Sequence, residues 1–136
     1  GSLRRALTLG VSPRPDDDTI HAMAARFGLG ALIERLGGLG GRVGESGRTL
    51  SDGERRRVQM ARAALMQPDL LLIDMPGLAS DAPLGREVAG FLQHHCSPTV
   101  LAVAPVGPLE AIANRRFVIA DGEVQEADNL SPALAS

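Results

Sequence analysis

The chain has 136 residues, of which 44% are hydrophobic and 22% charged, a composition that favours one globular domain and excludes a disordered one. Its net charge is −2 and it contains neither Trp nor Tyr, so nothing favours nucleic acid as a partner. No apolar run approaches the roughly 20 residues that cross a bilayer, and we expect this chain itself to be soluble.

The sequence contains no Lys, and all fourteen of its Lys and Arg positions are Arg. A phosphate-binding P-loop of the usual kind ends in a Lys that reaches the β- and γ-phosphates of a nucleotide. We therefore expect no such loop in this chain. Residues 37–47 are glycine-rich but lack a Lys-Ser or Lys-Thr ending. We interpret them as a flexible connection, since glycine mainly serves turns and positive φ.

The first third of the chain predicts two short helices after an irregular start. Residues 1–15 are expected to be extended and loop-like, because Pro13 and Pro15 disfavour helix. Three consecutive Asp residues come next, and acidic side chains suit the first turn of a helix, here predicted over about 17–27. A second short helix is predicted over 31–36, ending at a pair of glycines.

The clearest helix signal is a capping box, with Ser51 at the cap and Glu54 three residues later. The helix should run to about residue 66, since Pro68 follows. Its buried face is predicted from residues at helical spacing, namely Val58, Ala61 and Leu65. The three arginines at 55–57 should fan around the helix, and we interpret them as a solvated face rather than a phosphate-binding cluster.

The second half alternates strand and helix signals, which predicts an α/β fold. Leu70 to Ile73 form an apolar run ending at Asp74, as expected of a strand buried on both faces in a parallel sheet. The remaining predicted elements are a helix over 83–95, a second buried strand over 99–104, a short helix over 108–113, and a hairpin over 117–124 turning at Asp121-Gly122. The last ten residues are expected to form a frayed tail.

Several blocks resemble the nucleotide-binding domain of ABC transporters. Residues 50–65 resemble its signature segment, in which Leu-Ser-Gly-Gly-Gln precedes Arg-x-Arg and Ala-Arg-Ala, and Arg57 and Arg62 fall on the family's Arg positions. Residues 68–74 follow at the spacing of the Walker B strand. Three further blocks occur in family order. Residues 1–3 resemble the stretch just after the family's Q-loop, and residues 43–47 resemble the exporter-type loop before the signature. Residues 121–124 resemble the hairpin that closes the core.

The resemblance implies a partial P-loop NTPase core of the ABC ATPase type, with parallel strands, plus the ABC helical subdomain. Residues 1–126 would be the C-terminal part of the domain, with the helical subdomain at about 17–67, the Walker B half at about 68–126, and residues 127–136 as a tail. In the family, Walker A and the Q-loop lie N-terminal to this region. We therefore expect the chain to be an excised or truncated fragment.

The resemblance also names the nucleotide-binding positions, which are Leu50, Ser51, Asp52, Gly53, Glu54, Asp74 and Asp81. In the family, the signature Ser and Gly contact the γ-phosphate of ATP held by the partner's Walker A, and Ser51 and Gly53 match them. Asp52 replaces a Gly and Glu54 replaces a Gln. Two carboxylates beside an anion site should repel phosphate, and helix capping is their other interpretation. Asp81 keeps a position of the family's D-loop.

The catalytic positions are altered. Asp74 matches the residue that helps to hold Mg²⁺, in an indirect way, at the nucleotide, and a plain surface Asp is its other interpretation. Met75 occupies the position of the catalytic Glu, and a thioether cannot accept a proton from water. Pro105 occupies the position of the switch His. We therefore expect no intact catalytic residue, and a degenerate site of the kind that pairs with a competent one.

The function implied for the full-length parent is coupling of ATP binding and hydrolysis to transmembrane transport, at the cytoplasmic face of the cell membrane. The parent would use ATP and Mg²⁺ and would partner a second nucleotide-binding domain, head to tail, and the transmembrane domains. Neither ligand is expected on the fragment, which is predicted inactive by itself. Strand edges left without neighbours should make the fragment self-associate.

Two other functions stay open. One is a catalytically silent interaction or regulatory module built on the same fold, which the residues Met75 and Pro105 favour. The other is an ABC-like ATPase of chromosome or repair proteins, against which the exporter-like loop before the signature and the absence of a coiled-coil insertion both argue.

Overall fold

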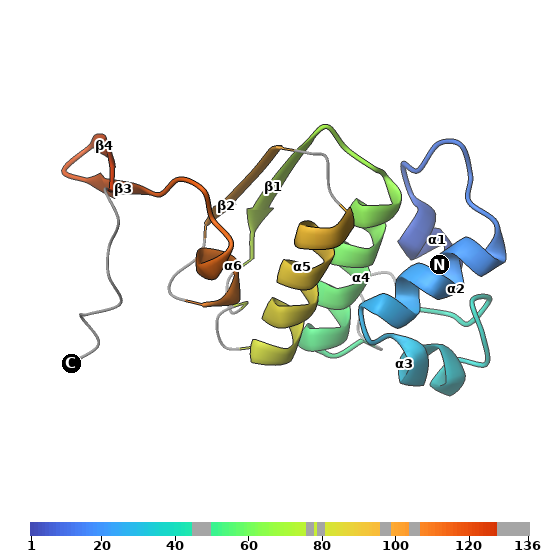
Figure 1. The fold of residues 1–136 in the computed structure, drawn as a ribbon. Coiled ribbons are helices and arrows are strands. Elements are labelled where there is room, and N and C mark those ends of the chain that lie inside the picture. The colour runs from blue at the N-terminus through green and yellow to red at the C-terminus, as the bar shows by residue number, and fades with distance from the viewer. Residues whose placement is uncertain (45–49, 76–77, 79–80, 96–98, 104–106, 128–136) are drawn as a thin grey trace.

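A computed structural model gives the fold, and it describes residues 1–44, 50–75, 78, 81–95, 99–103 and 107–127. The elements are α1 (Leu3–Thr8), α2 (Asp17–Arg26), α3 (Gly30–Arg35), α4 (Asp52–Leu65), β1 (Leu70–Asp74), α5 (Ala82–His95), β2 (Thr99–Val103), α6 (Pro108–Ala111), β3 (Phe117–Ala120) and β4 (Glu123–Glu126). β1 and β2 are parallel and are connected through α5, which confirms the predicted α/β class (Figure 1). Among the described residues, no helix has the length and apolarity that crossing a membrane requires.

Helix α1 corrects the prediction that residues 1–15 are extended. Ser2 caps the helix, because its side chain accepts a hydrogen bond from the backbone N–H of Arg5 at 3.3 Å. Leu3 and Leu7, one turn apart, are fully buried and anchor α1 in the core. The prolines at 13 and 15 restrict only themselves and the residues just before them, so they exert no effect as far back as α1.

Helix α4 is the central element of the helical part, and the capping-box prediction is confirmed in full. The predicted buried face is also confirmed, since Val58, Ala61 and Leu65 are all buried. Helices α1 and α2 both pack against α4, and α5 lies beside it (Figure 1). The buried residues form one continuous cluster that runs from Leu3 in α1 to Leu109 in α6.

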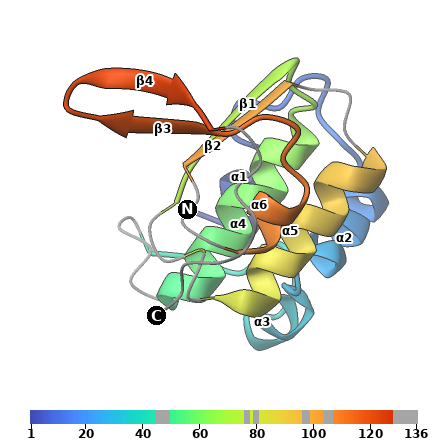
Figure 2. The same cartoon turned by 60° about the vertical axis from the view of Figure 1, so that its left-hand side comes forward.

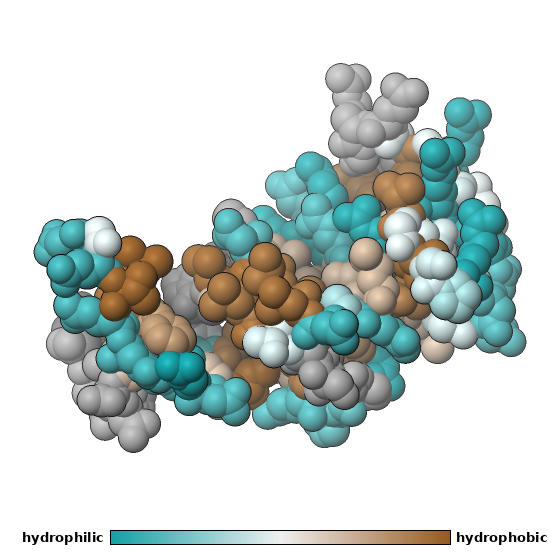
Figure 3. Space-filling model, turned by 90° about the horizontal axis from the view of Figure 1, so that it is seen from above, coloured by the Kyte–Doolittle hydropathy of each residue, from teal (hydrophilic) through white to brown (hydrophobic). Residues whose placement is uncertain are grey.

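Within the described residues, the two parallel strands are covered on one face only, which corrects the prediction that they are buried on both. Leu71 and Ile73 are buried and belong to the hydrophobic core. Helices α4 and α5 lie on one side of the strand pair (Figure 1). The alternate residues face outward, and Leu72 and Leu101 are 65% and 59% exposed. Figure 3 shows this apolar surface over the strands, with a second one on the hairpin. Apolar composition alone could not reveal that, among the described residues, only one helical layer covers the pair.

The hairpin of β3 and β4 extends away from the body of the molecule (Figure 2). Its two-residue turn was predicted from Asp121-Gly122, and both residues have positive φ, 52° and 80°. Its apolar side chains are exposed, with Ile119 at 77% and Val124 at 66%. The hairpin therefore presents a second apolar surface besides that of the parallel pair.

We predict that this chain self-associates through the uncovered face of β1 and β2. Parallel strands are normally covered on both faces, and an open apolar face with free edges tends to be covered by another chain. Replacing Leu72 and Leu101 with Thr, which suits strands, should lower the mass measured by light scattering toward that of a monomer. The matched control is Leu9→Thr, at a side chain that is 57% exposed beyond the end of α1. A chain that is already monomeric at high concentration would contradict the prediction.

Candidate functional site

The start of α4 carries most of the residues that the sequence assigned to nucleotide binding. The Ser51 hydroxyl accepts from the Glu54 backbone N–H at 3.2 Å, and the Glu54 carboxylate accepts from the Ser51 N–H at 2.8 Å. These two bonds satisfy two of the donors that a helix start leaves open. Leu50 is buried, 8% exposed, and its contribution is packing below the helix start. Asp52 and Gly53 follow in the first turn.

Each carboxylate of this helix start forms an ion pair with an arginine. Glu54 accepts a hydrogen bond from Arg35 of α3 at 2.7 Å, and Asp52 accepts one from Arg55 at 2.9 Å. Hydrogen bonding from the Ser51 N–H, followed by the contact with Arg35, lowers the pKa of Glu54 below its ordinary value. The partial positive charge of the helix start therefore already interacts with a carboxylate of the same helix, that of Glu54.

The lowered pKa of Glu54 gives a pH-dependent prediction. A carboxyl whose pKa is lower in the folded state contributes stability above its unfolded-state pKa and loses it as the pH falls through the folded-state pKa. Glu54→Gln should therefore lower the free energy of unfolding at pH 7 by roughly 0.5–1.5 kcal/mol. The difference from the unaltered chain should vanish in urea titrations repeated at progressively more acidic pH. Glu34→Gln, which removes an exposed carboxylate from α3, is the control, and an equal effect there would refute the assignment.

Asp81 lies beside Gly53, so the structure brings the predicted D-loop residue to the signature segment. A Cβ atom placed on Gly53 would be 3.7 Å from the Asp81 carboxylate. Asp81 precedes α5 and caps it, because its side chain accepts from the Leu84 N–H at 3.1 Å. Of the predicted binding residues, Ser51 to Glu54 and Asp81 thus form one cluster.

Arg57 corrects the interpretation of residues 55–57 as a solvated face. Its side chain is only 16% exposed and forms ion pairs with Glu87 of α5 and, at 3.6 Å, with Asp81. Its guanidinium also donates to the Phe27 carbonyl at 3.2 Å. Arg55 remains exposed, as predicted. Three successive residues on a helix point in different directions, and Arg57 is the one that faces the neighbouring helices. Because its charge is largely shielded from water, it requires acidic partners there.

The end of β1 carries the other predicted positions. Asp74 is the last residue of the strand, lies opposite Val103 of β2, and is exposed. Carboxyl ends of parallel strands are where α/β sheets bind ligands, and one exposed carboxylate fits Mg²⁺ that also binds water and phosphate. Met75 is partly buried and packs against the hydrophobic core. Pro105, assigned to the switch position, lies outside the described residues.

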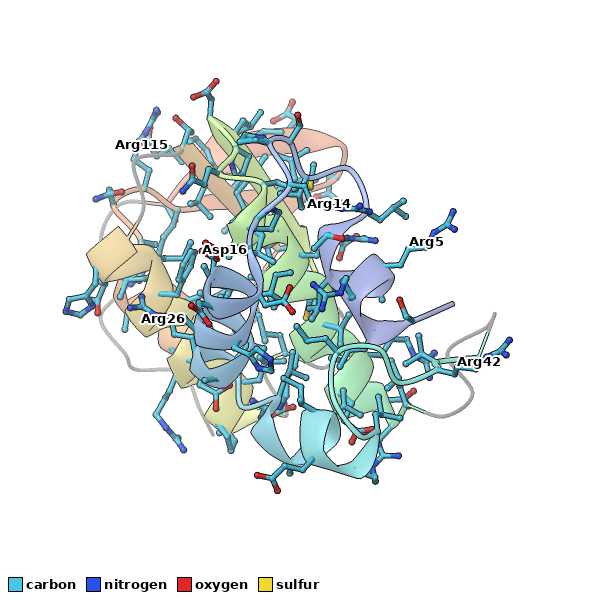
Figure 4. The ribbon with its side chains drawn as sticks, turned by 90° about the vertical axis from the view of Figure 1, so that its right-hand side faces the viewer. Arg5, Arg14, Asp16, Arg26, Arg42 and Arg115 are labelled. Carbon is cyan, nitrogen blue, oxygen red and sulfur yellow. The ribbon has the colours of Figure 1, made fainter. Side chains whose placement is uncertain are left out.

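The described surface shows no grouping that suggests a different kind of site. Figure 4 shows Arg5, Arg14, Arg26 and Arg42 on separate segments rather than in one patch, and Arg5 and Arg42 extend outward from the molecule. Asp16, also labelled there, caps α2 by accepting from the Thr19 N–H at 2.8 Å. Within the parts of the chain that the structure describes, no group of three or more His, Cys, Asp or Glu side chains could hold a metal ion.

A parallel strand that ends in an exposed Asp, next in sequence to a capped helix, places a carboxylate at the edge where α/β proteins bind their ligands. Many α/β proteins share this arrangement, so the family is decided by sequence comparison. The sequence profile of the ABC transporter family matches residues 4–77, more than half of the chain, including the start of α4 and all of β1. The chain therefore belongs to the ABC transporter family, and its fold is that of a partial ABC ATPase core.

Curated relatives support the same family. The chain is 37% identical over 105 residues to the macrolide export ATP-binding/permease protein MacB of Rhodospirillum rubrum, covering 76% of this chain and 16% of that protein. It is 31% identical over 125 residues to the thiamine import ATP-binding protein ThiQ of Shigella flexneri, covering 85% of this chain and 50% of ThiQ. The glutathione/L-cysteine transport protein CydC of Haemophilus influenzae is 31% identical over 103 residues, 75% of this chain and 18% of CydC. The chain thus spans half or less of each relative.

Proposed function

We propose that this chain is part of an ATP-binding domain of an ABC transporter whose own catalytic centre is degenerate. The observation that carries the proposal is Met75, which directly follows Asp74 at the end of β1 and packs against the core. A base that activates water must be a group that can accept a proton, and a thioether cannot do so. Asp74 can still contribute to holding Mg²⁺, so nucleotide binding and hydrolysis are separable here.

The start of α4 would contribute to a nucleotide site shared with a partner. A helix start attracts phosphate through its N–H groups and partial positive charge, and Gly53 gives close access to the backbone. The carboxylates of Asp52 and Glu54 weaken that attraction, although Arg35 and Arg55 neutralise part of their charge. We infer a weak contribution to the binding of a γ-phosphate presented by a second ATP-binding domain in head-to-tail contact.

The proposed partners are this second domain and the transmembrane domains of the transporter, at the cytoplasmic face of the membrane. The family membership and the permease relatives support this assignment, because MacB and CydC carry ATP-binding and permease functions in their names. One relative is an export protein and another is an import protein, so the proposal names no cargo and no direction.

Calorimetric titration of Mg-ATP tests the proposal at two levels. Titrated into this chain alone, Mg-ATP should give no measurable heat of binding, because no Lys is present to form a P-loop. Titrated into the intact transporter, it should bind. Binding to the chain alone would refute the proposal that this chain contributes only part of a nucleotide site. Failure of the intact protein to bind would instead favour a catalytically silent interaction module built on the same fold.

A further inference from the structure

Arg57 connects three segments that lie far apart in the sequence. From α4 its guanidinium pairs with Glu87 in α5 and with Asp81 just before α5. It also donates to the backbone carbonyl of Phe27, at the turn between α2 and α3. The guanidinium and both carboxylates are largely shielded, with exposed side-chain fractions of 16% for Arg57, 20% for Asp81 and 30% for Glu87. Such charge-assisted contacts are stronger than those on an open surface.

The turn at Gly28 is built to admit this guanidinium. Gly28 has a φ of +65°, which favours glycine, and a Cβ atom there would lie 2.9 Å from the Arg57 Nη1 atom. The same Cβ atom would lie 3.4 Å from the Glu87 carboxylate. A side chain at position 28 would therefore displace the ion pair. The backbone conformation of the turn and the position of Arg57 depend on each other.

Asp81 has two roles that Arg57 brings together. One carboxylate oxygen accepts from the Leu84 N–H and starts α5, and the same carboxylate lies against Gly53 in the first turn of α4. Arg57 lies four residues beyond Gly53 on α4 and pairs with Asp81 at 3.6 Å. A flat guanidinium can contact two carboxylates and a carbonyl at once in a fixed geometry, whereas the Lys ammonium is a flexible point charge.

We propose that Arg57 is a positioning residue that holds Asp81 beside Gly53 and fixes both relative to the turn at Phe27 and Gly28. Through Asp81, Arg57 sets the spacing between the start of α4 and the start of α5, where the proposed composite nucleotide site would be formed. This inference rests on the proposed function for its consequence in ATP binding. The placement of Asp81 itself is independent of any nucleotide.

The first measurement is amide hydrogen exchange, which needs no ATP. Arg57→Lys should speed exchange of the Leu84 and Gly85 N–H groups, since both bond to Asp81. The matched control is Arg4→Lys, which alters an Arg–Asp pair between α1 and α2 on the exposed side of the helical part. Unchanged exchange at Leu84 and Gly85 in Arg57→Lys would overturn the positioning role.

The second measurement is association of the intact protein with its partner ATP-binding domain in saturating Mg-ATP. Arg57→Lys and Asp81→Asn should each weaken it about tenfold, the loss expected from one charge-assisted contact. Asp81→Asn keeps an oxygen for the Leu84 N–H, so α5 stays capped. The double variant should be no weaker than either single one, because both changes remove the same contact.

The variant Glu87→Gln distinguishes the positioning role of Arg57 from a purely structural one. This variant removes the other carboxylate of Arg57 and should lower the melting temperature, yet leave ATP-dependent association within about twofold because the pair with Asp81 remains. Association that falls in step with melting temperature in all variants, or losses that add in the double variant, would overturn the inference. If the unaltered protein shows no ATP-dependent association, the proposed function fails, while the exchange measurement still decides the positioning role.

Discussion

Met75→Glu is expected to raise ATP turnover at this site by on the order of 10²-fold, the lower end of what a positioned general base contributes. The new carboxylate would directly follow Asp74, at the carboxyl end of β1 where the nucleotide is expected. Turnover should be measured in the intact transporter with the partner site silenced, so that only this site is observed. The expected gain is partial, because the family resemblance assigns Pro105 to the position of the switch His, and proline has no imidazole.

The matched control is Met75→Gln, which has the size and polarity of Glu without a basic oxygen. Met75 is partly buried against the core, so both variants bear a similar cost of placing a polar group there. A rise with Glu and none with Gln would support the degenerate site. Equal turnover in both variants, or substantial turnover at this site in the unaltered protein, would contradict it.

Phe27→Ala should be the most destabilising single truncation in the helical part, by about 3–5 kcal/mol. Phe27 has no exposed surface, and its ring lies 5.4 Å from that of Phe91, at an interplanar angle of 53°. The two rings pack the end of α2 against α5. Truncation would therefore leave a cavity between two helices, which close packing prevents from collapsing fully. Urea unfolding of the chain, followed by circular dichroism, measures the loss.

Phe117→Ala provides the control with the same chemical change. Phe117 is 47% exposed on β3 and contacts Arg115 through its ring face, at 4.9 Å from the ring centre. Its removal should cost about 1 kcal/mol or less, because an exposed cation–π contact contributes only about 0.5–1 kcal/mol. If the two truncations cost the same, the core assignment of Phe27 would be wrong.

Local signals in the sequence predicted most helices and the hairpin. Asp16 and Ser51 mark helix starts because their side chains can accept from the backbone two or three residues later, and both do so in the structure. Asp121-Gly122 marks a turn because both residues tolerate positive φ. Each of these features depends on chemistry within four or five residues. The sequence therefore contained all the information needed to place them.

Features that depend on distant partners were missed. Arg57 was assigned to solvent because its partners, Glu87 and the Phe27 carbonyl, are each 30 residues away in the sequence. The signal available was its place at the family's Arg position, on the same face of α4 as buried Ala61. The exposed face of β1 was missed for a related reason, since an apolar run does not show how many layers cover it.

The hydrophobic cluster that runs unbroken from α1 to α6 bears on how the chain unfolds. The division at about residue 67 into a helical subdomain and a Walker B half stays a prediction from the family pattern. Helix α4 lies on one side of that division yet packs against α1 and α2 and, through Arg57, is tied to α5 on the other. Loss of α4 would therefore remove support from both halves at once. We therefore expect the two parts on either side of residue 67 to unfold together as one cooperative unit, even if they have different roles in transport.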